Sequence, residues 1–276
     1  MSERVTLVAR QTIDTPLDTE GITPDRLVQL SAPEILRLPI WRGRERLDLG
    51  DVFDVRGDHA SSVVVEGAGP HVHGLGGGMA GGDLLIDGDA GHSTGAGMSG
   101  GVLVVRGNTR DDAAAGMSGG VFEVVGDCGD RLGASRPGES RGMTGGEIIV
   151  RGNVGREAGA RCRRGLLVIG GDAAEAAGQS MIAGSIVVFG RVAPGAGHFN
   201  KRGSLIALGG IEVPASYRYA CEYRPPHVRV SLLYLARRHG IAVDPRQVAG
   251  LYRRYCGDAM APGKGEILVW SPTDRV

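Results

Sequence analysis

The chain has 276 residues, of which 42% are hydrophobic and 22% charged, so it can bury a core and does not resemble a disordered chain. Its 31 basic residues balance 31 acidic ones, which gives no general reason to expect a nucleic-acid partner. The N-terminus lacks the apolar stretch of a secretion signal, and no apolar run reaches transmembrane length. We therefore expect a cytoplasmic protein with no membrane partner.

The N-terminal part of the sequence predicts a small cap followed by irregular strands. Residues 1–46 contain an edge strand at Val5–Ala9 and a short helix, which begins at a capping box formed by Ser31 and Glu34. Residues 47–75 carry apolar runs without a fixed period. We expect them to form irregular rungs that lead into the next segment, because the terminal units of a repeat must cover its open end.

A 19-residue repeat fills residues 76–210. Each unit has an anchor residue, usually Met, then a small residue, two glycines, an apolar run and Gly-Asp or Gly-Asn, as in MSGGVLVVRGN at residues 98–108. The anchor positions are Met79, Met98, Met117, Met143, Cys162, Met181 and Asn200. One step, from Met117 to Met143, is 26 residues long, which is one period plus seven residues.

This period predicts a mainly β fold. Each unit holds one strand-length run of Val, Ile and Leu between glycines and no segment with helical periodicity. Glycines suit the corners between strands, and 48 glycines against 4 Phe, 6 Tyr and 2 Trp suit a narrow interior. The sequence therefore predicts a single-stranded-type parallel β-helix (solenoid) of about seven 19-residue rungs, with a small N-terminal cap and a helical C-terminal tail.

Residues 211–276 form the predicted tail. Residues 228–239 predict an amphipathic helix that ends at Gly240, and Asp244 is a good N-cap for a second helix ending near Gly257. A last strand is expected at residues 266–270. The four cysteines show neither close pairing nor a metal-binding spacing, so we expect free thiols in a reducing compartment.

The familiar catalytic motifs do not account for this chain. Residues 95–100 match the G-x-G-x-x-G pattern of dinucleotide-binding proteins, but a strand follows instead of the required helix. The same letters recur one period earlier, which assigns them to the repeat. The sequence has no G-x-S-x-G, H-E-x-x-H or C-x-x-C motif and suggests no catalytic residue.

Two groups of side chains are candidates for binding. His73, His92 and Asp111 are each one period apart and should stack at one corner, where an alternative reading makes them zinc ligands. Basic residues also recur two rungs apart, roughly 10 Å along one face, and suit carboxylate-rich ligands or an acidic partner. They are Arg161, Arg163, Arg164, Lys201 and Arg202. Arginines in the tail extend this basic character.

The repeat resembles the Gly-rich domain at the C-terminal end of the glutamate synthase large subunit, which also makes up most of the C subunit of formylmethanofuran dehydrogenase. The stretches LRLPIWRG at residues 36–43 and LGDVFDVRG at residues 49–57 are similar to the lead-in of the C-subunit family. The resemblance covers residues 30–215. It implies a subunit of an enzyme complex, and the Arg-rich, Lys-poor composition favours the bacterial formyltransferase/hydrolase complex over the archaeal one.

The resemblance implies the following function. The complex would transfer a formyl group from formyl-tetrahydromethanopterin to a methanofuran-type carrier with a polyglutamate tail, and then release formate. This chain would be a non-catalytic connector that binds no cofactor of its own. Its partners would be an amidohydrolase-like A subunit, a B subunit and a formyltransferase D subunit. Two alternatives remain, namely the C subunit of a molybdenum or tungsten formylmethanofuran dehydrogenase that reduces CO2, and a stand-alone metalloenzyme using the histidine group.

Overall fold

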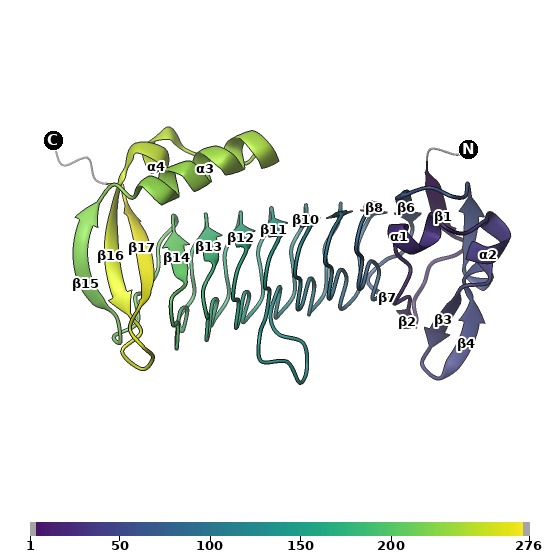
Figure 1. Ribbon diagram of the computed structural model, residues 1–276, viewed down its shortest axis with the longest axis horizontal. Helices are drawn as coiled ribbons and strands as arrows, with labels where there is room; N and C mark the ends of the chain where they lie inside the picture. The colour runs from purple at the N-terminus through teal and green to yellow at the C-terminus, as the bar shows by residue number, and fades with distance from the viewer. Residues whose placement is uncertain (1–3, 273–276) are drawn as a thin grey trace.

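The computed structural model describes residues 4–272. In it the chain forms an elongated row of strands with a cap at each end (Figure 1). The N-terminal part contains β1 (Val5–Ala9), β2 (Leu17–Asp18), α1 (Pro24–Leu27), α2 (Ala32–Leu36), β3 (Pro39–Arg42), β4 (Glu45–Asp48), a 3-10 turn at Leu49–Asp51, β5 (Phe53–Arg56), β6 (Ser62–Glu66) and β7 (Val72–His73). The repeat contains β8 (Asp83–Asp87), β9 (Val102–Val105), β10 (Val121–Val124), β11 (Glu147–Val150), β12 (Leu166–Ile169), β13 (Ser185–Val188) and β14 (Ser204–Ala207). The tail contains β15 (Arg218–Tyr223), α3 (Pro226–His239), α4 (Pro245–Ala249), β16 (Leu251–Gly257) and β17 (Gly265–Ser271).

Most of these strands belong to one sheet of 13 strands, in the order β15-β16-β17-β14-β13-β12-β11-β10-β9-β8-β6-β1-β5. All pairs from β1 through β6 and the repeat to β17 are parallel, and only the outermost pairs at each end are antiparallel. A separate four-stranded sheet, β4-β3-β2-β7, lies in the N-terminal cap. The prediction of a mainly β chain with stacked parallel strands is confirmed.

The 19-residue period fixes the register of the parallel strands. Leu84 pairs with Leu103 and Leu103 with Phe122, so equivalent positions of successive units lie side by side. The pairing continues across the longer step, where Phe122 faces Ile148. The seven additional residues are therefore excluded from the stack, and the chain there forms the long loop that projects below the row of strands in Figure 1.

The core runs along the inside of this row. Alternate strand residues point inward and are almost fully buried: Leu84, Leu103, Phe122, Ile148, Leu167, Ile186 and Leu205. The anchor residues form a second buried row that ends at Asn200, whose side-chain amide bonds both the N–H and the carbonyl of Gly203. Isolated parallel bridges from Ala90↔Thr109 to Val192↔Ile211 form a third row, so each unit stacks on the one before it.

The glycines are needed where units stack closely. Gly101 has φ +80°, and a Cβ there would lie 2.5 Å from the carbonyl oxygen of Gly82 on the preceding unit. Both the left-handed backbone and the close approach exclude larger residues. Gly120 and Gly146 occupy the equivalent corner with φ +84° each, which explains why the second glycine of the motif recurs.

The N-terminal cap differs from the prediction in one respect. The strand Val5–Ala9 is present, but it is not an edge strand, because it pairs with both β5 and β6. After the 3-10 turn the chain returns and forms β5, which pairs antiparallel with β1 on the side away from β6. No local sequence pattern predicts this pairing. The predicted capping box is confirmed, since the Glu34 carboxylate accepts hydrogen bonds from the N–H and the hydroxyl of Ser31.

The tail is less helical than predicted. Helix α3 matches the prediction and ends at Gly240, which has φ +62°. The second helix, α4, stops at Ala249, and the expectation that it continues to Gly257 is wrong. That segment is β16, which pairs with β17 along its whole length and on its other side with β15, the edge strand of the sheet. The last strand is confirmed, and it continues the parallel stack beyond β14. No helix within residues 4–272 combines the length and the apolar character that crossing a bilayer requires.

Candidate functional site

Four of the five predicted basic residues line one pocket. Arg163 and Arg164 follow the anchor Cys162, and Lys201 and Arg202 follow the anchor Asn200, so both pairs lie at the same corner two units apart. The pocket has a volume of about 570 Å³. Its remaining wall includes Pro262 and Lys264 from the turn between β16 and β17. We call Arg163, Arg164, Lys201, Arg202 and Lys264 the basic pocket.

The charge of the basic pocket is not compensated. Within residues 4–272, none of its five cations forms an ion pair. Other arginines do have carboxylate partners, such as Arg254 with Glu266 at 2.7 Å and Arg151 with Glu123 at 2.7 Å. Five cations around one pocket favour a ligand or protein surface that carries several carboxylates.

Arg161, the fifth predicted basic residue, does not line the basic pocket. Its backbone is left-handed, with φ +58°, which turns the chain between it and Arg163. Arg161 instead lines a second pocket of about 520 Å³ beside the projecting loop. One of its Nη atoms donates to the carbonyl of Glu139 in that loop at 3.4 Å. The residue before the anchor has a positive φ in other units as well, for example at Gly97, Gly116 and Ser180, so this backbone belongs to the repeat.

Sequence reasoning missed Lys264. This residue lies 62 positions beyond Arg202 in a turn outside the repeat, so the period gives no indication of it. Only the parallel pairing of β17 with β14 brings the turn to the pocket, because it carries the start of β17 to the side of the last repeat strand. The glycine and proline around it (APGKG) signal a turn but not its neighbour.

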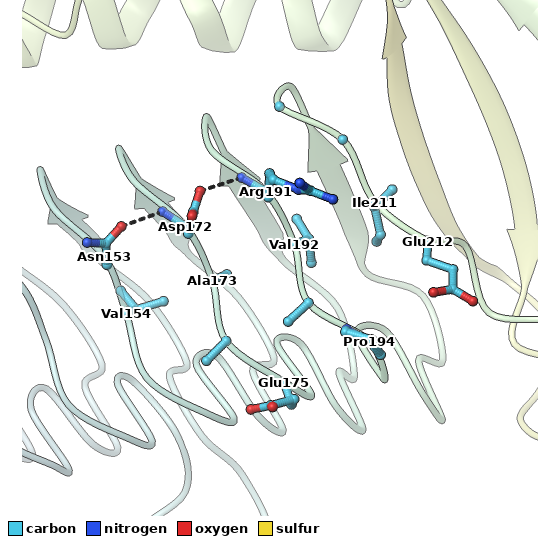
Figure 2. Close-up of a pocket in the computed structure, with 14 residues that line it drawn as sticks. Asn153, Val154, Asp172, Ala173, Glu175, Arg191, Val192, Pro194, Ile211 and Glu212 are labelled. Carbon is cyan, nitrogen blue, oxygen red and sulfur yellow. Dashed lines mark hydrogen bonds between the residues drawn. The ribbon is translucent and has the colours of Figure 1, made fainter.

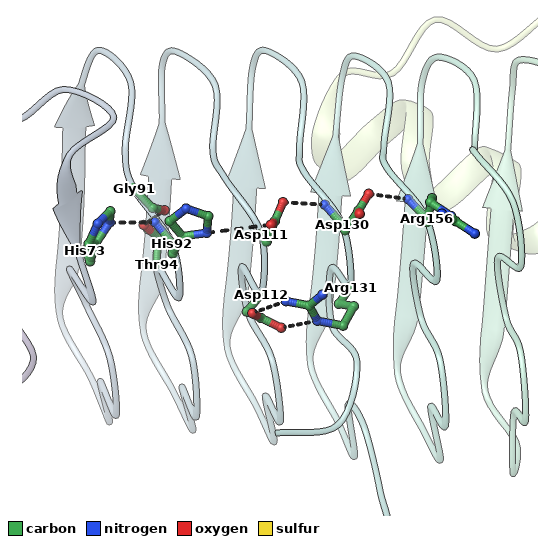
Figure 3. Close-up of polar contacts among 9 residues, drawn as sticks. All are labelled: His73, Gly91, His92, Thr94, Asp111, Asp112, Asp130, Arg131 and Arg156. Atoms are coloured by element: carbon green, nitrogen blue, oxygen red, sulfur yellow. Dashed lines mark hydrogen bonds and ion pairs between the residues drawn. The ribbon is translucent and has the colours of Figure 1, made fainter. Parts of the chain in front are cut away.

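The predicted histidine group is stacked, as Figure 3 shows. His73 Nδ1 accepts the backbone N–H of His92 at 3.0 Å, and the two rings lie 5.1 Å apart. His92 Nδ1 is 3.8 Å from a carboxylate oxygen of Asp111. Burial lowers the pKa of His73, and the nearby His92 and His71 lower it further.

The stacked group continues as a ladder of side chain to backbone bonds. Asp111 Oδ1 accepts the N–H of Asp130 at 2.9 Å, and Asp130 Oδ1 accepts that of Arg156 at 2.7 Å (Figure 3). His73 uses Nδ1 in the same manner, so this nitrogen is already occupied. Within residues 4–272, no group of three His, Cys, Asp or Glu side chains is placed to hold a metal ion. The geometry therefore does not support the zinc alternative.

A third pocket, of about 920 Å³, lies along the row of bridges near the tail (Figure 2). Two of its polar side chains bond to neighbouring units: Asn153 Oδ1 accepts the N–H of Asp172 at 2.8 Å, and Asp172 Oδ1 accepts that of Arg191 at 2.7 Å. These bonds explain the Gly-Asp and Gly-Asn ends of the repeat. The side chains there serve the stacking of the units.

The two buried thiols, Cys128 and Cys162, are in an environment that disfavours the reactive thiolate. Burial raises the pKa of Cys128 to about 12 and that of Cys162 to about 12. A thiolate is the reactive form of cysteine, so these two residues are inert at neutral pH. All four cysteines are free, as the sequence predicts.

Comparison with known proteins identifies relatives of two kinds. No protein-family model matches the chain. It is 33% identical over 92 residues to the C subunit of the molybdenum-containing formylmethanofuran dehydrogenase 1 of Methanosarcina barkeri, covering 32% of this chain and 31% of that protein. It is 35% identical over 86 residues to the C subunit of the formyltransferase/hydrolase complex Fhc of Methylorubrum extorquens, covering 31% of this chain and 32% of that protein. These matches span about a third of each relative.

The structural match extends over nearly the whole chain. A chain of the X-ray crystal structure of the formyltransferase/hydrolase complex FhcABCD from Methylorubrum extorquens, in complex with methylofuran, superimposes with a TM-score of 0.89. The two sequences are 34% identical, and the match covers 96% of this chain and 99% of that chain. The caps are therefore shared along with the repeat.

Proposed function

The chain belongs to the C-subunit family of formylmethanofuran dehydrogenases and formyltransferase/hydrolase complexes, and from this membership we propose that it is a subunit of a formyltransferase/hydrolase complex. The complex would move a formyl group from formyl-tetrahydromethanopterin to a methanofuran-type carrier and hydrolyse it to formate. The observation that carries the proposal is the match at 34% identity to a chain of such a complex from end to end. The A, B and D subunits of the same complex are the proposed partners, in the cytoplasm.

We assign this chain the role of a connector. Its fold is best described as a parallel β-helix of about seven rungs, in which each unit is bonded to the next through strand pairing, the row of bridges and the Asx side chains. Such a rod resists bending and offers long lateral faces. The proposed division is a cap at residues 1–46, irregular rungs at 47–75, the repeat domain at 76–210 and the C-terminal extension at 211–276.

The basic pocket is the proposed contact for a polyanion. Its five unpaired cations suit the polyglutamate tail of a methanofuran-type carrier or an acidic face of a neighbouring subunit. Methylofuran is bound in the related complex, which supports a carrier of this class. This chain alone supplies positive charge for positioning and leaves the chemistry to the other subunits.

An archaeal-type complex is the second candidate, because curated relatives include molybdenum and tungsten enzymes. Elemental analysis of the purified complex separates the two. Molybdenum or tungsten in the purified complex would favour a formylmethanofuran dehydrogenase, as the names of those relatives indicate, and a complex that releases formate without either metal would favour the formyltransferase/hydrolase complex.

The function is tested by reconstitution. The A, B and D subunits are co-expressed with and without this chain, and formate release from formyl-tetrahydromethanopterin is measured. We expect the purified chain alone to release no formate and the complete complex to release it. Formate release by the chain alone contradicts the connector role. An equally active complex that forms without this chain contradicts membership in the complex.

A further inference from the structure

Part of the outer face of the sheet is covered by a helix. Helix α3 lies across β11 to β14 and β17, as Figure 1 shows. The outward residues beneath it are apolar and at most 1% exposed: Ile149, Val168, Val187, Ile206 and Leu268. They pack against Val228, Leu232 and Leu235 of α3, separately from the core inside the row. The spacing of these three residues, four and then three, is that of one helix face.

The same outward row continues beyond α3 on β10, β9, β8 and β6. Strand register places Glu123 beside Ile149, then Val104, Leu85 and Val64 in succession. Val104, Leu85 and Val64 are partly exposed, unlike their counterparts under the helix. Val102 and Val121 are partly exposed on the adjacent row, and Val125 is 47% exposed. We call this surface the open sheet face.

Helix α3 ends at the boundary of the open sheet face. His239 Nε2 pairs with Glu147 Oε2 at 2.8 Å, and Arg151 bonds both the carbonyl of His239 and the carboxylate of Glu123. Gly240 then turns the chain toward α4. Glu123 interrupts the apolar row at this boundary, and apolar residues resume at Val104 on β9. Within residues 4–272, no helix packs on the outward residues of β6, β8, β9 and β10 as α3 packs on those of β11 to β14 (Figure 1).

We propose that the open sheet face docks an amphipathic helix of another subunit, in line with α3, and this proposal rests on the chain being a subunit of the complex. The dimensions agree. Helix α3 has 14 residues, about 21 Å at 1.5 Å per residue, and covers five strands that span about 19 Å. The four uncovered strands span about 14 Å, which a helix of about ten residues covers.

The charge at the borders of the open sheet face indicates which kind of helix would dock there. The borders of the open sheet face carry four carboxylates, of which Asp87 pairs with Arg106 and Glu123 with Arg151. Within residues 4–272, the other two, Glu66 and Asp83, form no ion pair and leave the face with a net negative charge. A helix that docks there carries small or branched apolar residues at helical spacing, flanked by Lys or Arg. The molecule contains a helix of this type, because Arg237 and Arg238 flank the apolar face of α3.

The first test places charged residues at the centre of the open sheet face in the co-expressed complex. The double variant Leu85→Lys/Val104→Lys is compared with Val230→Lys, which lies on the far side of α3 at a residue 66% exposed. Retention of this chain is measured by native mass spectrometry during dilution, after thermal unfolding has verified that both variants fold. We expect at least tenfold weaker retention for the double variant and less than a twofold change for the control. Equal retention of wild type and double variant overturns the proposal.

The second test identifies what occupies the face. A photo-crosslinking amino acid at position 85 should couple to a helical segment of another subunit that carries Lys or Arg beside its apolar residues. In addition, Asp83→Lys should weaken retention severalfold at low salt and less at high salt. Crosslinking to a strand, an acidic segment or a second copy of this chain overturns the proposal. A wild-type chain that joins no complex refutes the proposed function and this docking site together, whereas assembly without these effects refutes the docking site alone.

Discussion

His239 Nε2 lies 2.8 Å from Glu147 Oε2, and this pair fastens the last turn of α3 to β11. The His239 side chain is only 5% exposed. The second oxygen of Glu147 accepts the hydroxyl of Tyr234 at 2.6 Å. A single carboxylate of the repeat therefore holds two side chains of a helix that lies 87 and 92 residues further along the chain.

Removing this carboxylate should loosen the helix without unfolding the repeat. We expect Glu147→Ala to lower the free energy of unfolding by about 1–3 kcal/mol, because two hydrogen bonds to a charged group are lost and His239 stays buried. Hydrogen exchange should accelerate within α3 and remain unchanged in β8 and β9. The exposed Glu212 provides the control Glu212→Ala, which we expect to be neutral. Equal exchange in α3 for wild type and Glu147→Ala would contradict the assigned contact.

The glycine corners can be tested one at a time. Gly101→Ala places a methyl group 2.5 Å from the Gly82 carbonyl at φ +80°. The left-handed conformation alone costs about 1–2 kcal/mol for a residue with a Cβ, and the clash adds to it. Gly81→Ala is the matched control, since nothing lies within 4 Å of its Cβ position and its φ is not positive. We expect a clearly lower urea midpoint of unfolding for Gly101→Ala than for Gly81→Ala. Equal midpoints would contradict the close stacking of the units at Gly101.

The stability of the chain should depend on pH through His73. Its pKa in the folded chain is lowered by burial from the ordinary value of 6.5. The unfolded chain therefore binds a proton more readily, so stability is complete above about pH 6.5 and falls as the pH drops through the folded pKa. His73→Asn retains an oxygen that can accept the N–H of His92, as Asp111 does for Asp130. We expect a smaller loss below about pH 6.5 for this variant in thermal unfolding, and an unchanged pH profile would exclude His73 as the cause.

The basic pocket should control polyanion binding. Replacing Arg163, Arg164, Lys201 and Arg202 with Ala removes four unpaired charges. At about 0.2–1 kcal/mol for each exposed contact, the loss should amount to about 1–4 kcal/mol in carrier affinity or in assembly. Arg161→Ala is the control, because Arg161 lies in a neighbouring pocket at a similar chain position. Salt should weaken the wild type more than the quadruple variant. If the quadruple variant and the control behave alike, the pocket has no such role.

The sequence was sufficient to predict what the period determines. Equivalent positions of successive units must lie side by side. The stacking of His73 on His92, and the position of Arg163 and Lys201 at the same corner two units apart, therefore follow from counting residues. The corner glycines follow from the same reasoning.

Features set by pairings outside the repeat could not be predicted. The segment Leu251–Gly257 forms β16 through its pairing with β15 and β17, and Lys264 reaches the basic pocket because β17 continues the stack. The position of α3 across β11 depends on Glu147, which lies far away in the sequence. The contact of Arg161 with Glu139 depends on the projecting loop, whose path the period does not determine.

Native mass spectrometry of the untagged complex tests the central claim most directly. The chain is co-expressed with its candidate A, B and D subunits, and the intact assembly is weighed and then dissociated in steps. We predict that the chain is present in a fixed ratio to all three subunits. A complete A, B and D assembly that excludes this chain, or a chain that remains alone while the others assemble, would contradict the account.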